Sequence, residues 1–182
     1  MNQKRKLPLK IKISFTAYVA SSIDGRIAKS GDSGTDWTSK EDWFFFQKSL
    51  KKFDAVVVGH NTFRITKAQL KKRNTIVFTS KINKPKFCGS VIFFNPKKSN
   101  FKKFIKSQNY KKVAVLGGPK VYNYFLENKI LDELFVTIEP VVFTTGVPMF
   151  SGKLFRKYKF SLVSTKKLNK NGTLLLKYKY GN

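Results

Sequence analysis

The segment VAVLGGPKVYNYF, residues 113–125, constrains the fold of this chain more than any other stretch. Its first four residues are apolar, as expected of a strand that is covered on both faces of a sheet. Gly117 and Gly118 allow a sharp backbone turn, and Pro119 suits the first position of a helix. Apolar residues then recur at helical spacing as far as Leu126. The segment therefore predicts a buried strand, a tight turn and a helix.

The turn at Gly117 and Gly118 has two interpretations. The first N–H groups of a helix have no partner within the helix, and the helix dipole favours an anion there, so the turn could hold the pyrophosphate of a cofactor. A glycine pair is also common in ordinary tight turns between a strand and a helix. The residues alone leave both interpretations open.

The rest of the chain alternates strand and helix over its first two thirds and ends in a hairpin. Asn171-Gly172 is a turn signal in that hairpin, and Pro140 marks a bend or bulge in the strand before it. The pattern predicts an α/β fold with a central sheet of eight mostly parallel strands, an antiparallel C-terminal hairpin and about four flanking helices. The predicted strands span residues 10–20, 53–59, 74–80, 90–95, 113–116, 131–143 and two arms within 158–180, and the predicted helices span 37–52, 60–63, 99–108 and the residues after 118.

The length of 182 residues suits one domain, which we expect to span residues 10–182 after a basic tail at residues 1–9. Lys10 and Lys12 interrupt the apolar run near the N-terminus and leave it too short for a signal peptide, and no stretch has the length of a transmembrane segment. The expected location is the cytoplasm. A single cysteine and a single histidine exclude an internal disulfide and leave too few ligands for a Cys or His metal centre.

The formal net charge of +27 favours polyanionic partners such as nucleic acid, phosphorylated cofactors or polycarboxylate substrates. The lysines are spread along the whole chain and form no long block, so a lysine-rich solvated surface explains the charge equally well.

Two more segments suit an elongated, multiply phosphorylated ligand. Gly59 precedes a second helix start, and Thr79, Ser80 and Lys81 end a third strand. Because the carboxyl ends of parallel strands meet at one edge, these groups are expected to lie near the Gly-Gly turn. The polar, glycine-rich segment 21–36 is long enough to be a lid over such a site, or it is a plain surface loop.

Several motifs occur in a characteristic order along the chain. They are Trp37-x4-Asp42-x3-Phe46 on the first predicted helix, Gly59-His60-Asn61-Thr62-Phe63, Leu70-x2-Arg73, Gly117-Gly118-x2-Val121-Tyr122, and Thr137. In this order they resemble the dihydrofolate reductase family, and more distantly the reductase domain of riboflavin biosynthesis, which shares its fold. The resemblance covers roughly residues 13–150.

The resemblance implies a single-domain oxidoreductase that transfers hydride from NADPH to the pterin ring of dihydrofolate, in tetrahydrofolate biosynthesis and one-carbon metabolism. Asp42 is implied as the catalytic residue that binds the amino-pyrimidine edge of the pterin, with water as the expected proton donor. Phe46 would stack on the ring, and Arg73 would clamp the glutamate carboxylate of the folate tail. The implied substrate-binding residues are Tyr18, Asp42, Phe46, Leu70, Arg73 and Thr137, of which Thr137 supports the acidic residue.

The resemblance also implies a set of NADPH-binding residues and no metal. His60 stands where the family has an arginine that contacts the extra phosphate of NADPH, so Lys81 or Lys120 is expected to supply that charge. Pro119 stands where glycine or alanine is common. The implied cofactor-binding residues are Ile27, Gly59, His60, Asn61, Thr62, Thr79, Ser80, Lys81, Leu116, Gly117, Gly118, Pro119, Lys120, Val121 and Tyr122.

Three of these residues have structural alternatives. Asp42 also has the spacing of a carboxylate that caps the helix together with Ser39. Arg73 is one charge in a run of three, and Phe46 has the spacing of a core residue.

Three functions compete at this point. The lid segment SSIDGRIA resembles the riboflavin branch, whose reductases act on a ribosylaminopyrimidine phosphate. That branch carries an Asp-Asp-Pro motif after its glycine-threonine motif, and the corresponding FRITKAQL lacks it, which favours dihydrofolate. A nucleic-acid-binding protein, suggested by the charge, has no recognisable motif here. We therefore expect a small-molecule substrate, no membrane, no specific nucleic acid, and a monomer or homodimer.

Overall fold

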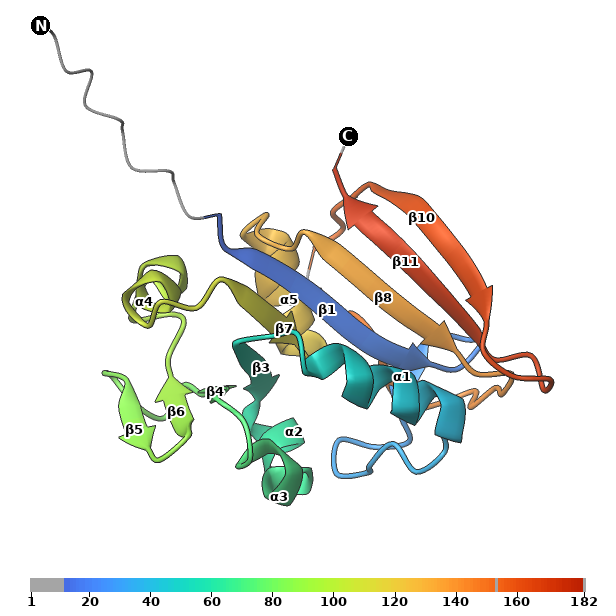
Figure 1. The fold of residues 1–182 in the computed structure, drawn as a ribbon, viewed down its shortest axis with the longest axis horizontal. Coiled ribbons are helices and arrows are strands. Elements are labelled where there is room, and N and C mark those ends of the chain that lie inside the picture. Colours follow the sequence, from blue (N-terminus) through green and yellow to red (C-terminus); the bar gives the residue numbers. More distant parts are fainter. Residues whose placement is uncertain (1–11, 153, 182) are drawn as a thin grey trace, which may run out of the picture.

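The first described strand of the chain, β1 (Ser14–Ser21), lies inside a nine-stranded sheet with strands on both sides (Figure 1). The structure is a computed structural model that describes residues 12–152 and 154–181. The expected tail at residues 1–9 and the start of the predicted first strand lie outside the described residues. The α/β fold class and the mostly parallel sheet are confirmed.

The other strands of this sheet, in chain order, are β3 (Ala55–Gly59), β4 (Thr75–Phe78), β5 (Lys86–Cys88), β6 (Val91–Phe94), β7 (Lys112–Val115), β8 (Glu133–Ile138), β10 (Phe160–Lys167) and β11 (Leu174–Tyr180). Their order across the sheet is β10-β11-β8-β1-β7-β3-β4-β6-β5. The strands from β8 to β6 are parallel, whereas β10, β11 and β5 are antiparallel to their neighbours. The predicted antiparallel C-terminal hairpin is therefore confirmed.

Helices cover both faces of the sheet because the strand residues alternate. In β1, Phe15, Ala17 and Val19 point to the face covered by α4 (Phe101–Ser107) and α5 (Pro119–Glu127), and all three are buried. Tyr18 belongs to the core on the other face. That face is covered by α1 (Lys40–Leu50), α2 (His60–Ile65) and α3 (Lys67–Leu70), and Figure 1 shows α1 in front of the sheet and α5 behind it.

The described residues contain nine strands in the main sheet and five helices, instead of the expected eight and four. The additional elements are short. β5, and the separate pair β2 (Arg26–Ala28) and β9 (Val147–Pro148), have two or three residues each, too few for an alternating pattern to show. Residues 67–70, expected to be part of a basic connection, form α3. β8 ends at Ile138, before the Pro140 that the prediction placed inside the strand.

The buried polar residues include two carboxylates, Asp42 and Glu139, but no lysine or arginine among the described residues. The positive charge of the described chain therefore lies at its surface and in half-buried side chains. No described helix is long and apolar enough to cross a membrane. The same part of the chain contains no cluster of three His, Cys, Asp or Glu side chains that could hold a metal ion.

Candidate active site

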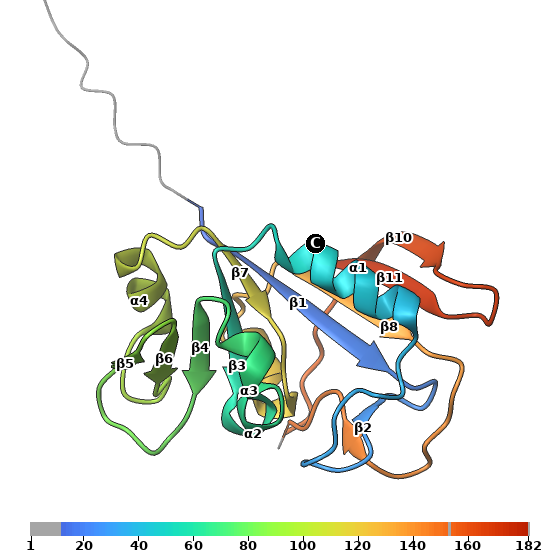
Figure 2. The same ribbon diagram turned by 60° about the horizontal axis from the view of Figure 1, so that its bottom comes forward.

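The candidate site lies at the edge of the sheet where the parallel strands β8, β1, β7, β3 and β4 end. In α/β folds, ligands bind at this carboxyl edge. The turns after β3, β4 and β7 lie there, and the first turn of α1 joins them, because Ser39 is hydrogen-bonded to Glu139 just beyond β8. Figure 2 shows the loops that rise from this edge, with β2 near the arrowhead of β1.

Two helix starts meet at this edge. The amide of Gly59, before α2, donates to the carbonyl of Gly117 at 2.8 Å. The peptide bond between Gly117 and Gly118 is cis. A Cβ built on Gly118 would meet only the Thr62 hydroxyl, at 3.8 Å, so there is open space beside this main chain. The open space beside Gly118, at the start of α5, fits the pyrophosphate of a dinucleotide, whereas the Gly59 amide is already bonded to Gly117.

Gly117 is glycine for another reason. Its φ is +94°, and a Cβ there would lie 2.8 Å from the ring of Tyr122. The turn after β7 therefore has one glycine demanded by the fold and a second, Gly118, that leaves room for a ligand.

Thr79, Ser80 and Lys81 follow β4 at the same edge. β4 pairs with β3 so that Phe78 lies opposite Gly59, and the amide of Lys81 donates to Thr79 Oγ1 at 3.2 Å. Lys81 is exposed and free to reach a phosphate. Of the remaining residues predicted to bind the cofactor, His60, Asn61 and Lys120 are exposed, Ile27, Thr62, Leu116 and Pro119 are half-buried, and Val121 and Tyr122 are buried in α5.

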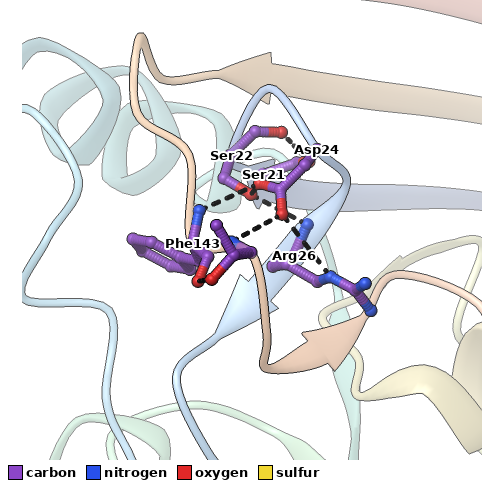
Figure 3. A network of polar contacts seen from close by, with 6 residues as sticks. Ser21, Ser22, Asp24, Arg26 and Phe143 are labelled. Atoms are coloured by element: carbon purple, nitrogen blue, oxygen red, sulfur yellow. Dashed lines mark hydrogen bonds and ion pairs between the residues drawn. The ribbon is translucent and has the colours of Figure 1, made fainter.

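The loop between β1 and α1 is fixed at its base by Asp24 (Figure 3). The Ser22 hydroxyl donates to Asp24 Oδ1 at 2.6 Å, and the amides of Phe143 and Thr144 donate to the same carboxylate at 3.1 and 3.0 Å. The hydrogen bond from Ser22, followed by that from Phe143, lowers the pKa of Asp24. The Arg26 Nε lies 3.7 Å from Asp24 Oδ2. These contacts join the start of the loop to the segment after β8.

Farther along the chain, the loop between β1 and α1 contacts α2, which begins at the carboxyl edge of the sheet. Asp32 forms an ion pair with Arg64 of α2. Both side chains are exposed, so the pair contributes little stability and can open. A firmly held base and a weakly held tip are the properties of a lid, the first of the two interpretations of this segment.

Trp37 follows the loop and lies beside its anchor. Its ring packs edge to face on Phe143, with 4.9 Å between centroids. Its Nε1 is buried and has no hydrogen-bond partner in the described part of the chain. Buried donors are normally paired, so this N–H is available to a ligand or to solvent.

Asp42 lies in the first turn of α1, buried beside β8. Burial raises its pKa, a hydrogen bond from Thr137 opposes this, and the nearby charge of Glu139 raises the pKa further. The sequence left open whether Asp42 caps the helix with Ser39. In the structure, the Ser39 amide donates to Glu139 Oε1 at 2.7 Å, so Glu139 takes the place of the capping carboxylate. The Asp42 side chain is therefore free for another role.

Tyr18 and Phe46 form part of an aromatic cluster between α1 and the sheet. Tyr18 is buried, and its ring stacks on that of Phe135 with 4.9 Å between the ring centroids. The ring centroid of the half-buried Phe46 lies 6.0 Å from that of Tyr18. Burial is the main cause that raises the Tyr18 pKa, and a hydrogen bond with Ser49 opposes it. Leu70 is also buried in this core. The side chains of Tyr18 and Leu70 thus serve packing, and Phe46 lies between the core and the surface.

Arg73 lies at the opposite end of α1 from Asp42. Its guanidinium donates two long hydrogen bonds of 3.4 Å, to the carbonyl of Leu50 and to Gln47 Oε1. It lines a cavity of about 340 Å³ together with Lys71 and Lys72. A larger cavity of about 490 Å³ lies elsewhere, between α5 and the C-terminal strands, and contains none of the predicted site residues.

Sequence reasoning missed Glu139 and the unpaired Trp37 Nε1. Glu139 is the one acid in the mostly apolar run VTIEPVVF, and it is 4 % exposed. A carboxylate in such a run is the signal that could have identified it, because buried acids need specific partners.

The comparisons with known proteins agree with this architecture. The sequence model described as dihydrofolate reductase matches residues 15–180. The Bacillus subtilis (strain 168) protein YwjB, described as uncharacterized, is 27 % identical over 157 residues, which are 82 % of this chain and 88 % of YwjB.

Two solved structures show the same fold. A pyrimidine reductase-like protein from Corynebacterium diphtheriae has a TM-score of 0.75 and 18 % identity, with 93 % of this chain and 92 % of that chain covered. Dihydrofolate reductase from Enterococcus faecalis, complexed with NADP(H) and RAB-propyl, has a TM-score of 0.65 and 22 % identity, with 93 % and 97 % covered. The match of the family model over nearly the whole described chain, together with this fold, shows that the chain belongs to the dihydrofolate reductase family.

Proposed function

We propose that this protein reduces dihydrofolate to tetrahydrofolate with NADPH, by hydride transfer to the pterin ring. The family and the fold support a reductase with a nicotinamide cofactor. The observation that carries the proposal of an amino-pyrimidine ring as substrate is the environment of Asp42. Its buried carboxyl lies at the ligand edge of the sheet and is not used to cap α1, because Glu139 accepts the Ser39 amide.

Asp42 suits the amino-pyrimidine edge of a pterin. That edge presents an amino N–H and a ring N–H side by side, and a carboxylate accepts both in a fork. Thr137 of β8 lies beside the carboxyl, and its hydrogen bonding lowers the pKa of Asp42. Holding the ring in one orientation relative to the cofactor is worth much of the rate acceleration in such reactions.

NADPH supplies the hydride when bound, with its pyrophosphate at Gly59, Gly117 and Gly118. Reduction of the ring C=N bond also needs a proton on the ring nitrogen. The raised pKa of Asp42 keeps a proton available in the site closer to neutral pH, and water is the proposed donor to the ring. The lid excludes bulk solvent during the transfer.

The other end of α1 accounts for the folate tail. Asp42 and Leu50 are eight positions apart in the helix, or about 12 Å along its axis. Arg73 contacts Leu50, so a substrate that runs along α1 places its pterin at Asp42 and an anionic group at Arg73. Dihydrofolate has its glutamate at this kind of separation from the pterin. The lysines beside Arg73 make the cavity there attractive to a carboxylate.

A riboflavin-pathway substrate, a ribosylaminopyrimidine phosphate, is the second candidate. The lid sequence at residues 21–28 and the fold shared with a pyrimidine reductase-like protein favour it. Its aminopyrimidine could also meet Asp42, but its ribosyl phosphate is shorter than the folate tail.

The test is NADPH oxidation followed spectrophotometrically, with dihydrofolate and the ribosylaminopyrimidine phosphate side by side, and with NADH in place of NADPH. We expect turnover with dihydrofolate and NADPH. Turnover with the aminopyrimidine alone would reject the folate assignment in favour of the second candidate. If neither is reduced and the protein binds DNA tightly at physiological salt, the reductase proposal fails and the nucleic-acid alternative gains; binding that vanishes at modest salt would reflect charge alone.

A further inference from the structure

Glu139 connects three parts of the molecule at the first turn of α1. Its Oε1 accepts hydrogen bonds from the amide of Ser39 at 2.7 Å and from the Ser39 hydroxyl at 2.8 Å. Its Oε2 accepts a hydrogen bond of 2.7 Å from the hydroxyl of Thr173, in the turn between β10 and β11. With 4 % of its surface exposed, this carboxylate is held by protein donors. Both of its oxygens therefore act as acceptors, and three donors share them.

A short chain of hydrogen bonds connects Glu139 to Asp42. The Ser39 hydroxyl that donates to Glu139 accepts a hydrogen bond of 3.3 Å from the amide of Asp42. The position of the first turn, and with it the Asp42 side chain, therefore depends on Glu139. The turn on the far side is also fixed, because Asn169 bonds to Thr173 at 2.9 Å and to Glu41 of α1 at 3.2 Å.

We propose that Glu139 is a positioning residue for Asp42: it fastens the first turn of α1 to the end of β8 and to the β10–β11 turn, and it places a second carboxylate near the carboxyl of Asp42. Asp42 and Glu139 then have different tasks. The Asp42 carboxyl has Thr137 beside it and keeps acceptor capacity for the substrate, whereas both oxygens of Glu139 accept hydrogen bonds from protein donors. Two carboxyl groups in different environments commonly divide such roles.

Glu139 is the charged group whose field reaches Asp42, raising its pKa. The other ionisable groups on the elements packed there are directed elsewhere. On α1, Lys40 is exposed and Glu41 bonds to Asn169. Glu133, at the far end of β8, pairs with Lys177 at 2.7 Å. On β1, Ser49 hydrogen-bonds the side chain of Tyr18 and lowers its pKa, while burial raises it. In the loop between β1 and α1, Asp24 pairs with Arg26. Lys170, in the turn between β10 and β11, is exposed.

The first experiment measures the ionisation of Asp42 directly, by 13C NMR titration of the carboxyl in the full chain without substrate or cofactor. Glu139→Gln keeps an oxygen for both Ser39 hydrogen bonds but removes the charge. The Asp42 midpoint is expected to fall by on the order of half a pH unit or more. The matched control is Glu133→Gln, which removes a carboxylate from the same strand and should leave the midpoint unchanged. An unchanged midpoint in Glu139→Gln, or an equal fall in the control, overturns the proposal.

A second variant tests the fastening and does not require Glu139 to be changed. Thr173→Val removes the donor to Oε2, and we expect altered amide chemical shifts at Ser39 and Asp42, although these residues are far away in the sequence. Thr165→Val, at an exposed position on β10 of the same hairpin, is the control and should leave both amides unchanged. If Thr173→Val also leaves them unchanged, the hairpin does not position α1 and the proposal fails.

The role in the reaction rests on the proposed function, and a rate measurement separates the two. With dihydrofolate and NADPH, Glu139→Gln should shift the pH at which turnover declines toward lower pH, which a general loss of stability would not do. The NMR shift without any dihydrofolate turnover would reject the proposed substrate and leave the coupling of the two carboxyls intact. Turnover without the NMR shift would reject the role of Glu139 alone.

Discussion

The hydroxyl of Tyr122 donates a hydrogen bond of 2.6 Å to the main-chain carbonyl of Tyr18. It joins α5, which begins at the proposed pyrophosphate turn, to β1, which runs beside the proposed substrate site. Tyr122 is buried, and burial raises its pKa, so the hydroxyl remains a donor at all physiological pH values. Its ring also occupies the space next to Gly117. This side chain therefore adds a second connection between the two halves of the site, beside the direct pairing of β1 with β7.

This arrangement predicts opposite results for the two neighbouring glycines. Gly117→Ala forces a side chain into a positive φ and against the Tyr122 ring, so the free energy of unfolding should fall by about 2 kcal/mol or more. Gly118→Ala meets only Thr62, and stability should change by less than about 1 kcal/mol. NADPH affinity, measured by fluorescence titration, should nevertheless fall at least about 10-fold in Gly118→Ala, because the methyl group enters the space next to the proposed pyrophosphate. Unchanged affinity in this variant would contradict the cofactor assignment.

Asp42→Asn should separate stability from activity. Because the folded protein raises the pKa of Asp42, the stability contributed by the protonated carboxyl is present below its ordinary pKa and is lost as pH rises through the raised value. Asparagine does not titrate, so the melting temperature of the variant relative to the wild type should increase from acid to neutral pH. If the melting temperatures of the two proteins change with pH in parallel, the pKa of Asp42 is not raised in the folded protein.

The same substitution should reduce dihydrofolate turnover by a factor on the order of 100, within the range of general acid–base roles. The loss should be smaller at low pH, where solvent protonates the pterin directly. NADPH affinity serves as the control and should not change. Normal turnover in a folded Asp42→Asn protein would remove the main support for the folate assignment.

Arg73→Lys keeps the charge at the far end of α1 but removes the planar fork. Dihydrofolate affinity should fall roughly 10-fold, the value of about one charge-assisted hydrogen bond. A pterin without the glutamate should bind as before. The neighbouring change Lys72→Gln removes a charge from the same cavity without touching the fork and should have a smaller effect. Equal losses for both ligands would mean that Arg73 does not bind the tail.

The preference for NADPH over NADH should depend on an exposed lysine and on salt. Lys81 follows the hydroxyls of Thr79 and Ser80 at the end of β4, and it is solvent-exposed. Lys81→Gln should reduce the ratio of the two affinities by roughly two- to five-fold, because exposed ion pairs are weak. Raising the ionic strength should have a similar effect on the wild type. Lys120→Gln tests the other candidate lysine. If neither substitution nor salt changes the ratio of NADPH affinity to NADH affinity, neither lysine contacts the extra phosphate of NADPH.

The fold was predictable where long periodic segments decide it. The apolar run before Gly117 correctly predicted β7, and the helical spacing after it predicted α5. The helix predicted over residues 37–52 corresponds to α1. The strands of two or three residues were not predicted, because they are too short to show an alternating pattern. For β2 the partner is also distant in sequence: Arg26 lies opposite Pro148.

The site was harder to predict from the sequence, because its contacts join residues that are distant along the chain. Ser39 was recognised as a cap, but its amide has Glu139 as partner, 100 positions away, and local spacing suggested Asp42 instead. Tyr18 was expected at the substrate, yet its ring is stacked on Phe135 in the core. Motif order gave candidate residues, of which Arg73 lies in a cavity near the starts of β3 and β4 and Tyr18 lies in the core, because tertiary contacts decide where each side chain lies.

The position of β1 also determines how the protein can be made. β1 is paired on one side with β7, through partners such as Phe15 and Val113, and on the other with β8, through partners such as Tyr18 and Phe135. A chain that leaves the ribosome N-terminus first must therefore extend from Ser14 as far as Lys112 before one edge of this strand can pair, and as far as Glu133 before the other edge can pair. Both edges of β1 stay open until β7 has emerged, and one edge stays open until β8 has followed as far as Ile138. An open edge can pair with other nascent chains, and closure of such distant contacts is slow. The yield of folded protein should therefore depend on chaperones that cover β1 until its partner strands have been synthesised.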